Sequence, residues 1–182
     1  IFGDKDITKS PMYKRARMGI GYLAQEPSIF GKISVEDNLK IVLETIISSK
    51  EEQNNLIDKL LNEFNISHIR NNMGAGLSGG ERRRVEICRT LALKPDFVLL
   101  DEPFAGVDPI AVEDIQQMII SLKQQNIGVL ITDHNVRETL SITDRSYLLH
   151  GGKILKSGDA QTLASDEEVR RIYLGKNFKL DQ

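Results

Sequence analysis

Hydrophobic and polar residues follow two different periods along the chain, and the helical period dominates its middle. Apolar residues at helical spacing follow Ser34, which forms a capping-box pattern with Asp37, so a helix is predicted there. Its apolar face is expected to contain Val35, Leu39, Val42, Leu43 and Ile46. A second helix is predicted from Leu56, Leu60, Leu61 and Phe64. The polar run at residues 48–55 is interpreted as a solvated turn before it.

A third helix is predicted to start after Gly79 and Gly80. Its apolar face is expected to contain Val85, Cys88, Leu91 and Ala92. Its charged residues, Glu81, Arg82, Arg83 and Arg84, are assigned to the outer face. Residues 25–93 therefore form a helical region.

Short apolar runs on either side of this region predict strands that alternate with helices. The strands are expected at residues 19–23, 97–101 and 128–131. Asp108 and Pro109 predict a helix start, because Asp is a good N-cap and Pro suits the first helical position. This alternation indicates an α/β sheet with its ligand chemistry at the carboxyl ends of the strands.

The C-terminal part is predicted to contain a short helix, a hairpin and a closing helix. Val136 and Leu140 belong to the short helix. The hairpin pairs residues 146–149 with 154–156 around the turn residues Gly151 and Gly152. Residues 166–175 are expected to form an amphipathic helix that closes the fold.

Composition excludes several classes of protein. The chain has 182 residues, 27% of them charged, and a formal net charge of −2, which does not suit nucleic-acid binding. No apolar run approaches the ~18 residues that a membrane-spanning helix needs. The single cysteine cannot form an internal disulfide, which fits a reducing compartment. His68, His134 and His150 are scattered, which argues against a metal-centred hydrolase.

A glycine-containing turn at residues 77–81 carries the strongest chemical signal. Ser78, Gly79 and Gly80 precede or open a helix, whose free N–H groups and positive dipole end suit a phosphate group. The alternative is a glycine-rich helix start without a ligand. The pattern G-x-G-x-x-G that begins at Gly74 does not follow a strand, so dinucleotide binding is rejected.

Two acids, Asp101 and Glu102, end the apolar run at residues 97–101. Side chains alternate along a strand, so one acid can reach a Mg²⁺ ion while the other faces an attacking water. The alternative is an acidic strand end that is simply exposed. Gln25 and His134 also follow predicted strands. Neither residue indicates a site by itself, and each is a candidate only because of its position relative to the two acids.

In this order the motifs resemble the ATP-binding subunit of ABC transporters, over essentially the whole chain. The resemblance implies a P-loop NTPase (RecA-like) α/β fold with a parallel-sheet core and an inserted helical subdomain. The partial core would comprise residues 1–24 and 94–165, the helical subdomain residues 25–93, and the C-terminal helix and tail residues 166–182.

The resemblance also implies roles for individual residues, with ATP and Mg²⁺ as cofactors. Gln25 would sense Mg²⁺, the water and the transmembrane partner, while Asp101 would help to hold Mg²⁺. Glu102 would polarise the attacking water, and His134 would read the γ-phosphate. Residues that would contact ATP bound by a second copy, or would join the two sites, are Ser78, Gly79, Gly80 and Asp108.

Longer matches at residues 78–87, 101–109 and 131–140 resemble ATPases that drive lipopolysaccharide export. The ending Tyr173, Leu174 and Gly175 followed by Phe178 fits the same group. This resemblance implies a homodimer bound to transmembrane permease subunits at the inner face of the inner membrane. The alternatives are a branched-chain amino-acid importer ATPase and a soluble ABC ATPase. Exposed apolar residues in the loop of Ile29, Phe30 and Gly31 are expected either to dock the permease or to plug a local core.

A phosphate-binding loop of the form G-x-x-x-x-G-K-[ST] does not occur in the printed sequence. In the resembled family it lies upstream of the strand that ends before Gln25, so the fold is expected to be truncated at its N-terminus. The 182 residues alone are then expected to hydrolyse almost no ATP and to expose apolar sheet surface. A measurable Mg²⁺-dependent ATPase activity of these residues would contradict that expectation. A degenerate, non-catalytic module is the alternative, which an upstream in-frame loop would exclude.

Overall fold

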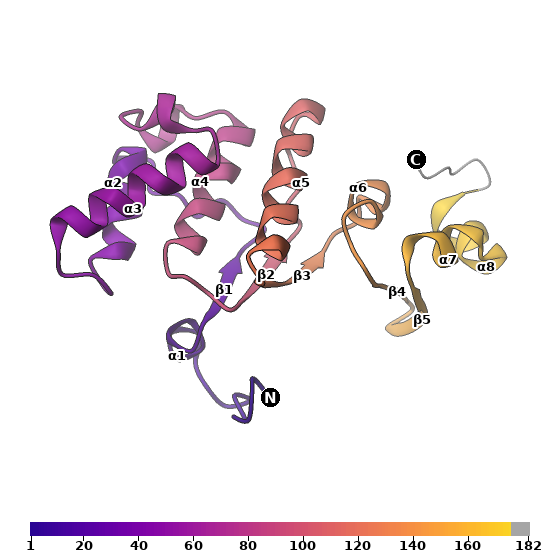
Figure 1. The fold of residues 1–182 in the computed structure, drawn as a ribbon. Coiled ribbons are helices and arrows are strands. Elements are labelled where there is room, and N and C mark those ends of the chain that lie inside the picture. Colours follow the sequence, from indigo (N-terminus) through magenta and orange to yellow (C-terminus); the bar gives the residue numbers. More distant parts are fainter. Residues whose placement is uncertain (176–182) are drawn as a thin grey trace. The chain divides into compact units, whose positions relative to one another are not determined.

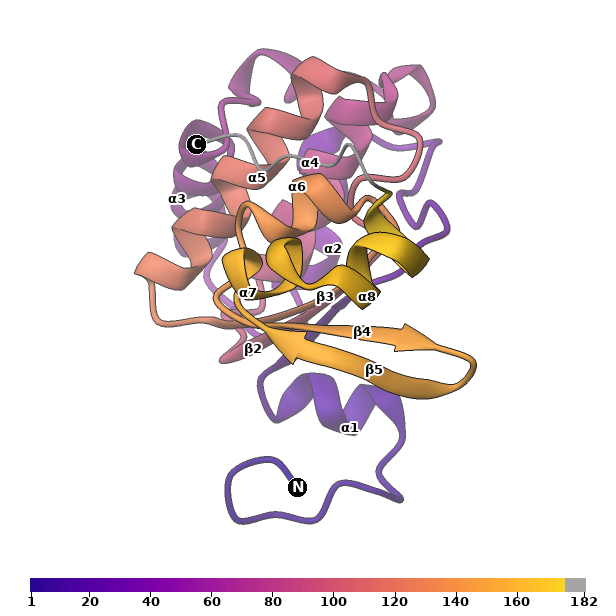
Figure 2. The same cartoon turned by 90° about the vertical axis from the view of Figure 1, so that its right-hand side faces the viewer.

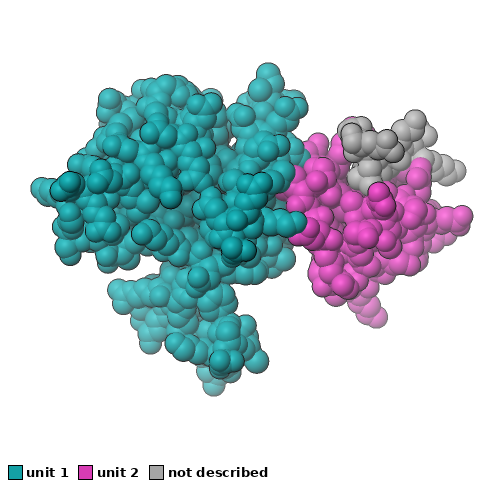
Figure 3. Space-filling model, in the orientation of Figure 1, with its two compact units in different colours: residues 1–132 teal, residues 133–182 magenta. Residues whose placement is uncertain are grey.

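The computed structural model of the chain describes residues 1–175 and divides the chain into two compact units. Figure 3 colours unit 1, residues 1–132, and unit 2, residues 133–182. Phe178, which belongs to the predicted C-terminal pattern, and the tail at 176–182 lie outside the described residues.

Strands β1 (Ile20–Leu23), β2 (Phe97–Asp101) and β3 (Gly128–Thr132) form a parallel sheet in unit 1, in that order. The register places Leu23 beside Leu100, and Leu100 beside Ile131. All the carboxyl ends therefore reach the same edge of the sheet (Figure 1). The predicted α/β class and the predicted parallel strands are confirmed.

The two faces of this sheet are covered to different extents. On one face, Leu23, Val98 and Leu100 are at most 1% exposed. Helix α4 covers this face so closely that a Cβ on Gly21 would lie 2.7 Å from Cγ2 of Thr90. On the opposite face, Tyr22 is 47% exposed and Leu130 is 50% exposed. Apolar side chains of the sheet are thus open to solvent on that face.

Helices make up most of the rest of unit 1. Their bounds are α1 (Met12–Arg17), α2 (Val35–Leu43), α3 (Lys50–Glu63), α4 (Gly79–Leu91) and α5 (Pro109–Gln124), with 3₁₀ turns η1 (Ser67–Ile69) and η2 (Gly74–Gly76). Figure 1 shows α2, α3 and α4 gathered in one cluster, and α5 packs against β3. Local capping decides where these helices start, because a side chain accepts a backbone N–H bond at Ser34, Ser49, Ser78 and Asp108.

The polar run at residues 48–55 is mostly helical, so its interpretation as a solvated turn was wrong. Helix α3 begins at Lys50, where the hydroxyl of Ser49 accepts from the N–H of Glu52. Acids in the first turn also suit the positive end of the helix dipole. Gln53 is only 5% exposed and donates to the carbonyl of Ile47 at 2.6 Å. Because the polar residue Gln53 lies on the buried face of α3, the hydrophobic pattern did not reveal the start of this helix.

Unit 2 has its own small core. Its elements are α6 (Val136–Leu140), β4 (Ser146–His150), β5 (Lys153–Gly158), α7 (Ala160–Ser165), α8 (Glu167–Val169) and the π-helical turn η3 (Arg170–Leu174). Figure 2 shows α6, α7 and α8 on one side of the antiparallel β4–β5 hairpin. Their buried side chains are Leu140, Leu148, Leu163 and Val169.

The hairpin prediction is confirmed, since Gly151 and Gly152 take φ values of +56° and +74° as a tight turn of this kind requires. The closing helix is confirmed with a change. It starts at α8, capped by Asp166, and widens into the π-helical η3. Helix α7 lies before it and was not predicted.

Glu36 on α2 makes stability depend on pH. Hydrogen bonds from Arg70, at 2.6 Å, and from Lys40 lower the pKa of Glu36 from 4.5 to about 2. The stabilisation is therefore complete above pH 4.5 and is lost as the pH falls towards 2. Glu36→Gln is expected to reduce the free energy of unfolding at pH 6 and to flatten its decline over that window.

Urea denaturation at a series of pH values from 6 to about 3 measures this effect. Glu44→Gln, which neutralises an exposed carboxylate at the end of the same helix, is the matched control. An identical slope against pH in the Glu36→Gln variant and the unmodified chain would contradict the prediction.

Within residues 1–175, no helix has both the length and the apolar character that crossing a membrane requires.

Candidate functional site

The carboxyl edge of the unit 1 sheet joins two predicted site residues that are far apart in the chain. Gln25 follows β1, and Glu102 follows β2. The side-chain amide Nε2 of Gln25 donates to Oε2 of Glu102 at 2.8 Å, although the two residues are 77 positions apart. Both side chains are accessible to solvent, so a small ligand can reach the pair. The parallel register brings them together by ending β1 and β2 side by side.

The backbone of Glu102 adopts a conformation that is unusual for a residue with a side chain. Its φ is +44°, in the left-handed region. Its N–H donates to the carbonyl of Thr132 at 2.7 Å, and its own carbonyl accepts from the N–H of Ala105 at 3.1 Å. A strained residue that the surrounding hydrogen bonds hold in place is typical of functional sites. Here the strain turns the chain sharply at the point where the carboxylate must face Gln25.

Asp101, the preceding acid, takes different partners. Its Oδ1 accepts from the hydroxyl of Thr132 at 2.6 Å, and its Oδ2 accepts from the hydroxyl of Tyr22 at 3.4 Å. The predicted divergence of Asp101 and Glu102 is therefore confirmed. Tyr22 and Thr132 were not predicted as site residues. The strand register was the signal that could have found them, since Thr132 is paired with Asp101.

The turn at residues 78–80 opens α4 as predicted. Ser78 is the N-cap, and a complete capping box links it to Glu81, whose Oε2 accepts from the N–H of Ser78 at 2.8 Å. This backbone hydrogen bond, with that from the Ser78 hydroxyl, lowers the pKa of Glu81. A negative charge is thus held at the positive end of the α4 dipole.

One glycine of this turn lies against the segment that leads into α5, and the other lies against the first turn of α5. A Cβ on Gly79 would lie 3.0 Å from the carbonyl oxygen of Gly106. A Cβ on Gly80 would lie 2.5 Å from Cβ of Ala111 and 3.7 Å from Oδ2 of Asp108. Asp108 in turn caps α5 by accepting from the N–H of Ala111 at 3.0 Å. The structure therefore brings together the helix start at residues 78–80 and Asp108.

The assignment of every charge at residues 81–84 to the outer face of α4 was wrong at Arg83. Arg83 is 6% exposed, and Glu86, one turn further along, is 3% exposed. Helix α4 packs against β1, α2 and α5, so little of its circumference remains for an outer face. The guanidinium of Arg83 donates to backbone carbonyls at the end of β2 and just before Gln25.

His134 lies at the start of unit 2, in the segment between β3 and α6. Its side chain is 69% exposed, and its Nδ1 is 4.0 Å from Oδ1 of Asp133. In the chain it is the second residue after Thr132, which binds Asp101. A role for His134 beside Glu102 stays a prediction.

Phe30, in the loop after Gln25, presents an exposed aromatic ring on a fixed backbone. Phe30 is 52% exposed, and the guanidinium of Arg89 lies 5.4 Å from the centroid of its ring. Buried Asn38 accepts from the N–H of Phe30 at 2.9 Å and donates to its carbonyl at 3.0 Å. Burial lowers the pKa of Arg89. The sequence leaves two interpretations of this loop open, a surface that contacts the permease and a plug that fills a local core. The exposure of Phe30 favours the contact surface.

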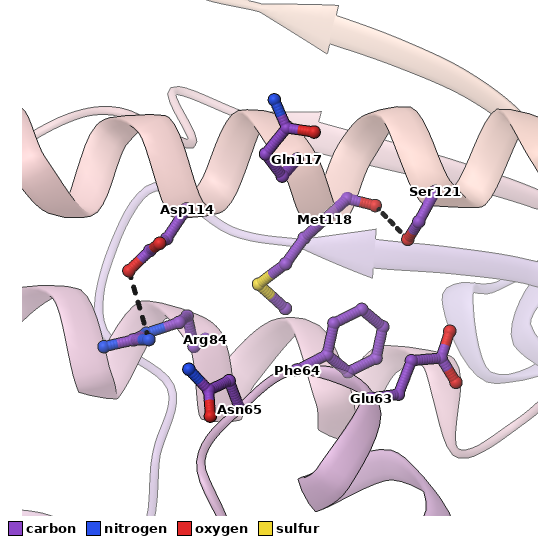
Figure 4. Close-up of a pocket in the computed structure, with 8 residues that line it drawn as sticks. All are labelled: Glu63, Phe64, Asn65, Arg84, Asp114, Gln117, Met118 and Ser121. Atoms are coloured by element: carbon purple, nitrogen blue, oxygen red, sulfur yellow. Dashed lines mark hydrogen bonds and ion pairs between the residues drawn. The ribbon is translucent and has the colours of Figure 1, made fainter.

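A separate cavity of about 190 Å³ lies between the end of α3 and the helices α4 and α5. Figure 4 shows Arg84 pointing towards Asp114, with which it forms an ion pair at 3.2 Å. Phe64 and Met118 supply apolar lining nearby (Figure 4). None of the predicted site residues lines this cavity.

Comparison with known proteins identifies the family of the chain. The family described as ABC transporter matches residues 1–105, more than half of the chain. The chain therefore belongs to the ABC transporter family.

Two relatives of the chain are named as ATP-binding proteins. The chain is 53% identical to the lipopolysaccharide export system ATP-binding protein LptB of Haemophilus influenzae, covering 99% of the chain and 75% of that protein. It is 55% identical to a probable ABC transporter ATP-binding protein of Azorhizobium caulinodans, covering 96% of the chain and 62% of that protein. The chain thus spans 62% of one of these relatives and 75% of the other.

The fold of the chain is similar to that of a solved ATP-binding cassette. The ADP conformation of MJ1267, an ATP-binding cassette of an ABC transporter, superposes with a TM-score of 0.80 at 29% identity. The match covers 96% of the chain and 76% of that structure. The predicted P-loop NTPase class of fold is confirmed.

Proposed function

We propose that this chain is part of an ATP-hydrolysing subunit of an ABC transporter that drives lipopolysaccharide export. The hydrogen bond between Gln25 and Glu102 is the observation that carries the proposal. It supports a hydrolytic centre, because it aims an amide and a carboxylate at the same solvent-accessible point on the carboxyl edge of the sheet. The names of the relatives support lipopolysaccharide as the substrate over a branched-chain amino acid.

The acids at this edge suit Mg²⁺ bound together with a nucleotide. Among the described residues, no three His, Cys, Asp or Glu side chains gather into a metal cluster. Mg²⁺ in nucleotide sites commonly takes one or two protein oxygens and completes its shell with phosphate and water. Asp101 and Gln25 would hold the ion, which when bound neutralises phosphate charge.

Glu102 acts as the base in this proposal. Its carboxylate accepts a hydrogen bond from Gln25 and is partly exposed, so it can orient a water molecule and accept its proton. The carboxylates of the two acids take different partners, Gln25 for Glu102 and hydroxyl groups for Asp101. The two acids can then serve different tasks, metal binding and proton acceptance.

A second copy of the chain completes the proposed site. Ser78, Gly79 and Gly80 present the N-terminus of α4, which suits the γ-phosphate of ATP held by the other copy. Asp108 lies against this turn and would connect the two sites of the dimer. His134 would contact the γ-phosphate from the segment after β3.

The permease contact is proposed at Phe30. Its exposed ring stands on the loop that starts at Gln25, so movement of a transmembrane partner would reach the hydrolytic centre through a few residues of chain. In this proposal the subunit works at the cytoplasmic face of the inner membrane, where such a partner would hold it.

Reconstitution tests the proposal. The complete protein is expected to hydrolyse ATP with Mg²⁺ when assembled with its transmembrane partners in lipopolysaccharide-containing vesicles, and to release lipopolysaccharide to an acceptor only with ATP. Phe30→Ala is expected to reduce transport with little change in ATP affinity, and Ile41→Ala, an exposed residue on α2, is the matched control. ATP-dependent uptake of branched-chain amino acids without lipopolysaccharide release would reject the proposed substrate.

A further inference from the structure

Arg83 connects parts of unit 1 that the chain places far apart. Its side chain is 6% exposed, and Glu86 is at 3.4 Å as its ion-pair partner. The guanidinium donates to a set of backbone carbonyls from two segments: Ala24 at 2.7 Å, Asp101 at 2.8 Å, Glu102 at 3.0 Å and Pro103 at 3.3 Å. One side chain on α4 thus holds the residue before Gln25 and the turn around Glu102.

The strained turn at Glu102 explains why an arginine is needed there. A φ of +44° at this residue bends the chain so that successive carbonyls of residues 101–103 point towards α4. Crowded carbonyls inside a protein require donors, and an unsatisfied one is costly. Only the planar guanidinium supplies several N–H groups in a fixed fork. Arg83 therefore stabilises the conformation that positions the carboxylate of Glu102.

Glu86 extends the same connection along the loop after Gln25. Its Oε1 accepts from the N–H of Ser28 at 2.5 Å and from the N–H of Ile29 at 3.1 Å. Arg83 holds the loop at Ala24 and Glu86 holds it at residues 28–29, so α4 fixes both ends of the segment that carries Gln25. The buried charges also neutralise each other.

We propose that Arg83, paired with Glu86, is a positioning residue that sets the Gln25 loop against the strained turn at Glu102 from the helix that begins at Ser78. A displacement of α4 then moves the amide of Gln25 and the carboxylate of Glu102 together. This inference rests on the proposed function, because the geometry it controls is that of the hydrolytic centre.

The test compares two neighbouring arginines of α4 in the complete protein assembled with its transmembrane partners. Arg83→Met is expected to lower kcat for Mg²⁺-dependent ATP hydrolysis about 30- to 100-fold, since a displacement of ~1 Å at a reacting group costs about 100-fold. KM for ATP is expected to change less than about 3-fold, because Arg83 supports the chemical step rather than ATP binding. The control Arg84→Met removes the ion pair to Asp114 and is expected to leave kcat within about 3-fold.

A second comparison, made in the Glu102→Gln variant, distinguishes a positioning role of Arg83 from a general loss of stability. In the Glu102→Gln variant the carboxylate is absent, so adding Arg83→Met is expected to reduce the residual hydrolysis of radiolabelled ATP by less than about 3-fold. A purely structural defect would reduce hydrolysis equally in both backgrounds. Arg83→Lys keeps the buried positive charge beside Glu86, so it serves in the same comparisons if the methionine variant fails to fold.

These experiments distinguish a failure of the proposed function from a failure of the positioning role of Arg83. An unmodified complex without Mg²⁺-dependent ATPase activity would overturn the proposed function. An active complex in which Arg83→Met matches Arg84→Met, or in which its full loss persists without the Glu102 carboxylate, would overturn the positioning role alone.

Discussion

Replacement of Glu102 by glutamine is expected to lower ATP turnover by the complete protein about 10²- to 10⁴-fold, the range for loss of a general base. Glutamine has nearly the same shape as glutamate, and its side-chain oxygen can still accept the hydrogen bond that Gln25 donates at 2.8 Å. The backbone turn is held by Thr132 and Ala105 through main-chain atoms, so it does not depend on the carboxylate. The substitution therefore removes basicity while retaining geometry.

Single-turnover hydrolysis of radiolabelled ATP measures the loss, and equilibrium binding of ATP measures what is retained. ATP affinity is expected to stay within about 3-fold of the unmodified protein, because the lost group acts on the water. Glu113→Gln, which neutralises an exposed carboxylate on α5, is the matched control. Turnover by the Glu102→Gln variant within about 3-fold of the control would reject Glu102 as the base.

Gly80→Ala is expected to separate the start of α4 from the start of α5. The new Cβ would lie 2.5 Å from Cβ of Ala111, a distance at which one helix must shift. Forcing a methyl group into a packed contact commonly costs about 1–3 kcal/mol. The shift also moves the helix start at Ser78 away from Asp108, so ATP hydrolysis by the assembled dimer is expected to fall with stability.

A compensating change makes this prediction specific. Adding Ala111→Gly removes the opposing Cβ and leaves Oδ2 of Asp108 at 3.7 Å as the nearest remaining contact, so the double variant is expected to recover most of the lost activity. Gly76→Ala is the control in the same loop, because no atom lies within 4 Å of the added Cβ. Thermal unfolding and ATPase rates measure both effects. A double variant no better than Gly80→Ala would show that the contact with Ala111 is not the cause.

Local signals predicted the elements correctly where a few neighbouring residues decide the structure. Asp108 and Pro109 start α5 at the expected residue because a cap involves atoms within one turn. Gly151 and Gly152 specify their hairpin because the turn needs positive φ at both positions. The apolar run of β2 predicted a strand of the parallel sheet, although only the face that carries Val98 and Leu100 is fully buried.

The same signals failed where distant residues decide the burial of a polar group. Gln53 looks like a turn residue until its bond to the carbonyl of Ile47 is known. Arg83 looks like an exposed charge until the carbonyls around it are known. Periodicity scores a polar residue as exposed, whereas a polar residue can be buried once partners from other segments satisfy its hydrogen bonds.

The sequence alone determines the order and identity of the motifs from Gln25 to His134. It also determines the caps and strands that carry them. Tertiary structure alone decided which of those residues meet. It paired Gln25 with Glu102, gave Asp101 the hydroxyls of Tyr22 and Thr132, and buried Arg83 between them. These contacts join segments tens of residues apart, and they exist only because parallel strands end at a common edge and α4 packs across it.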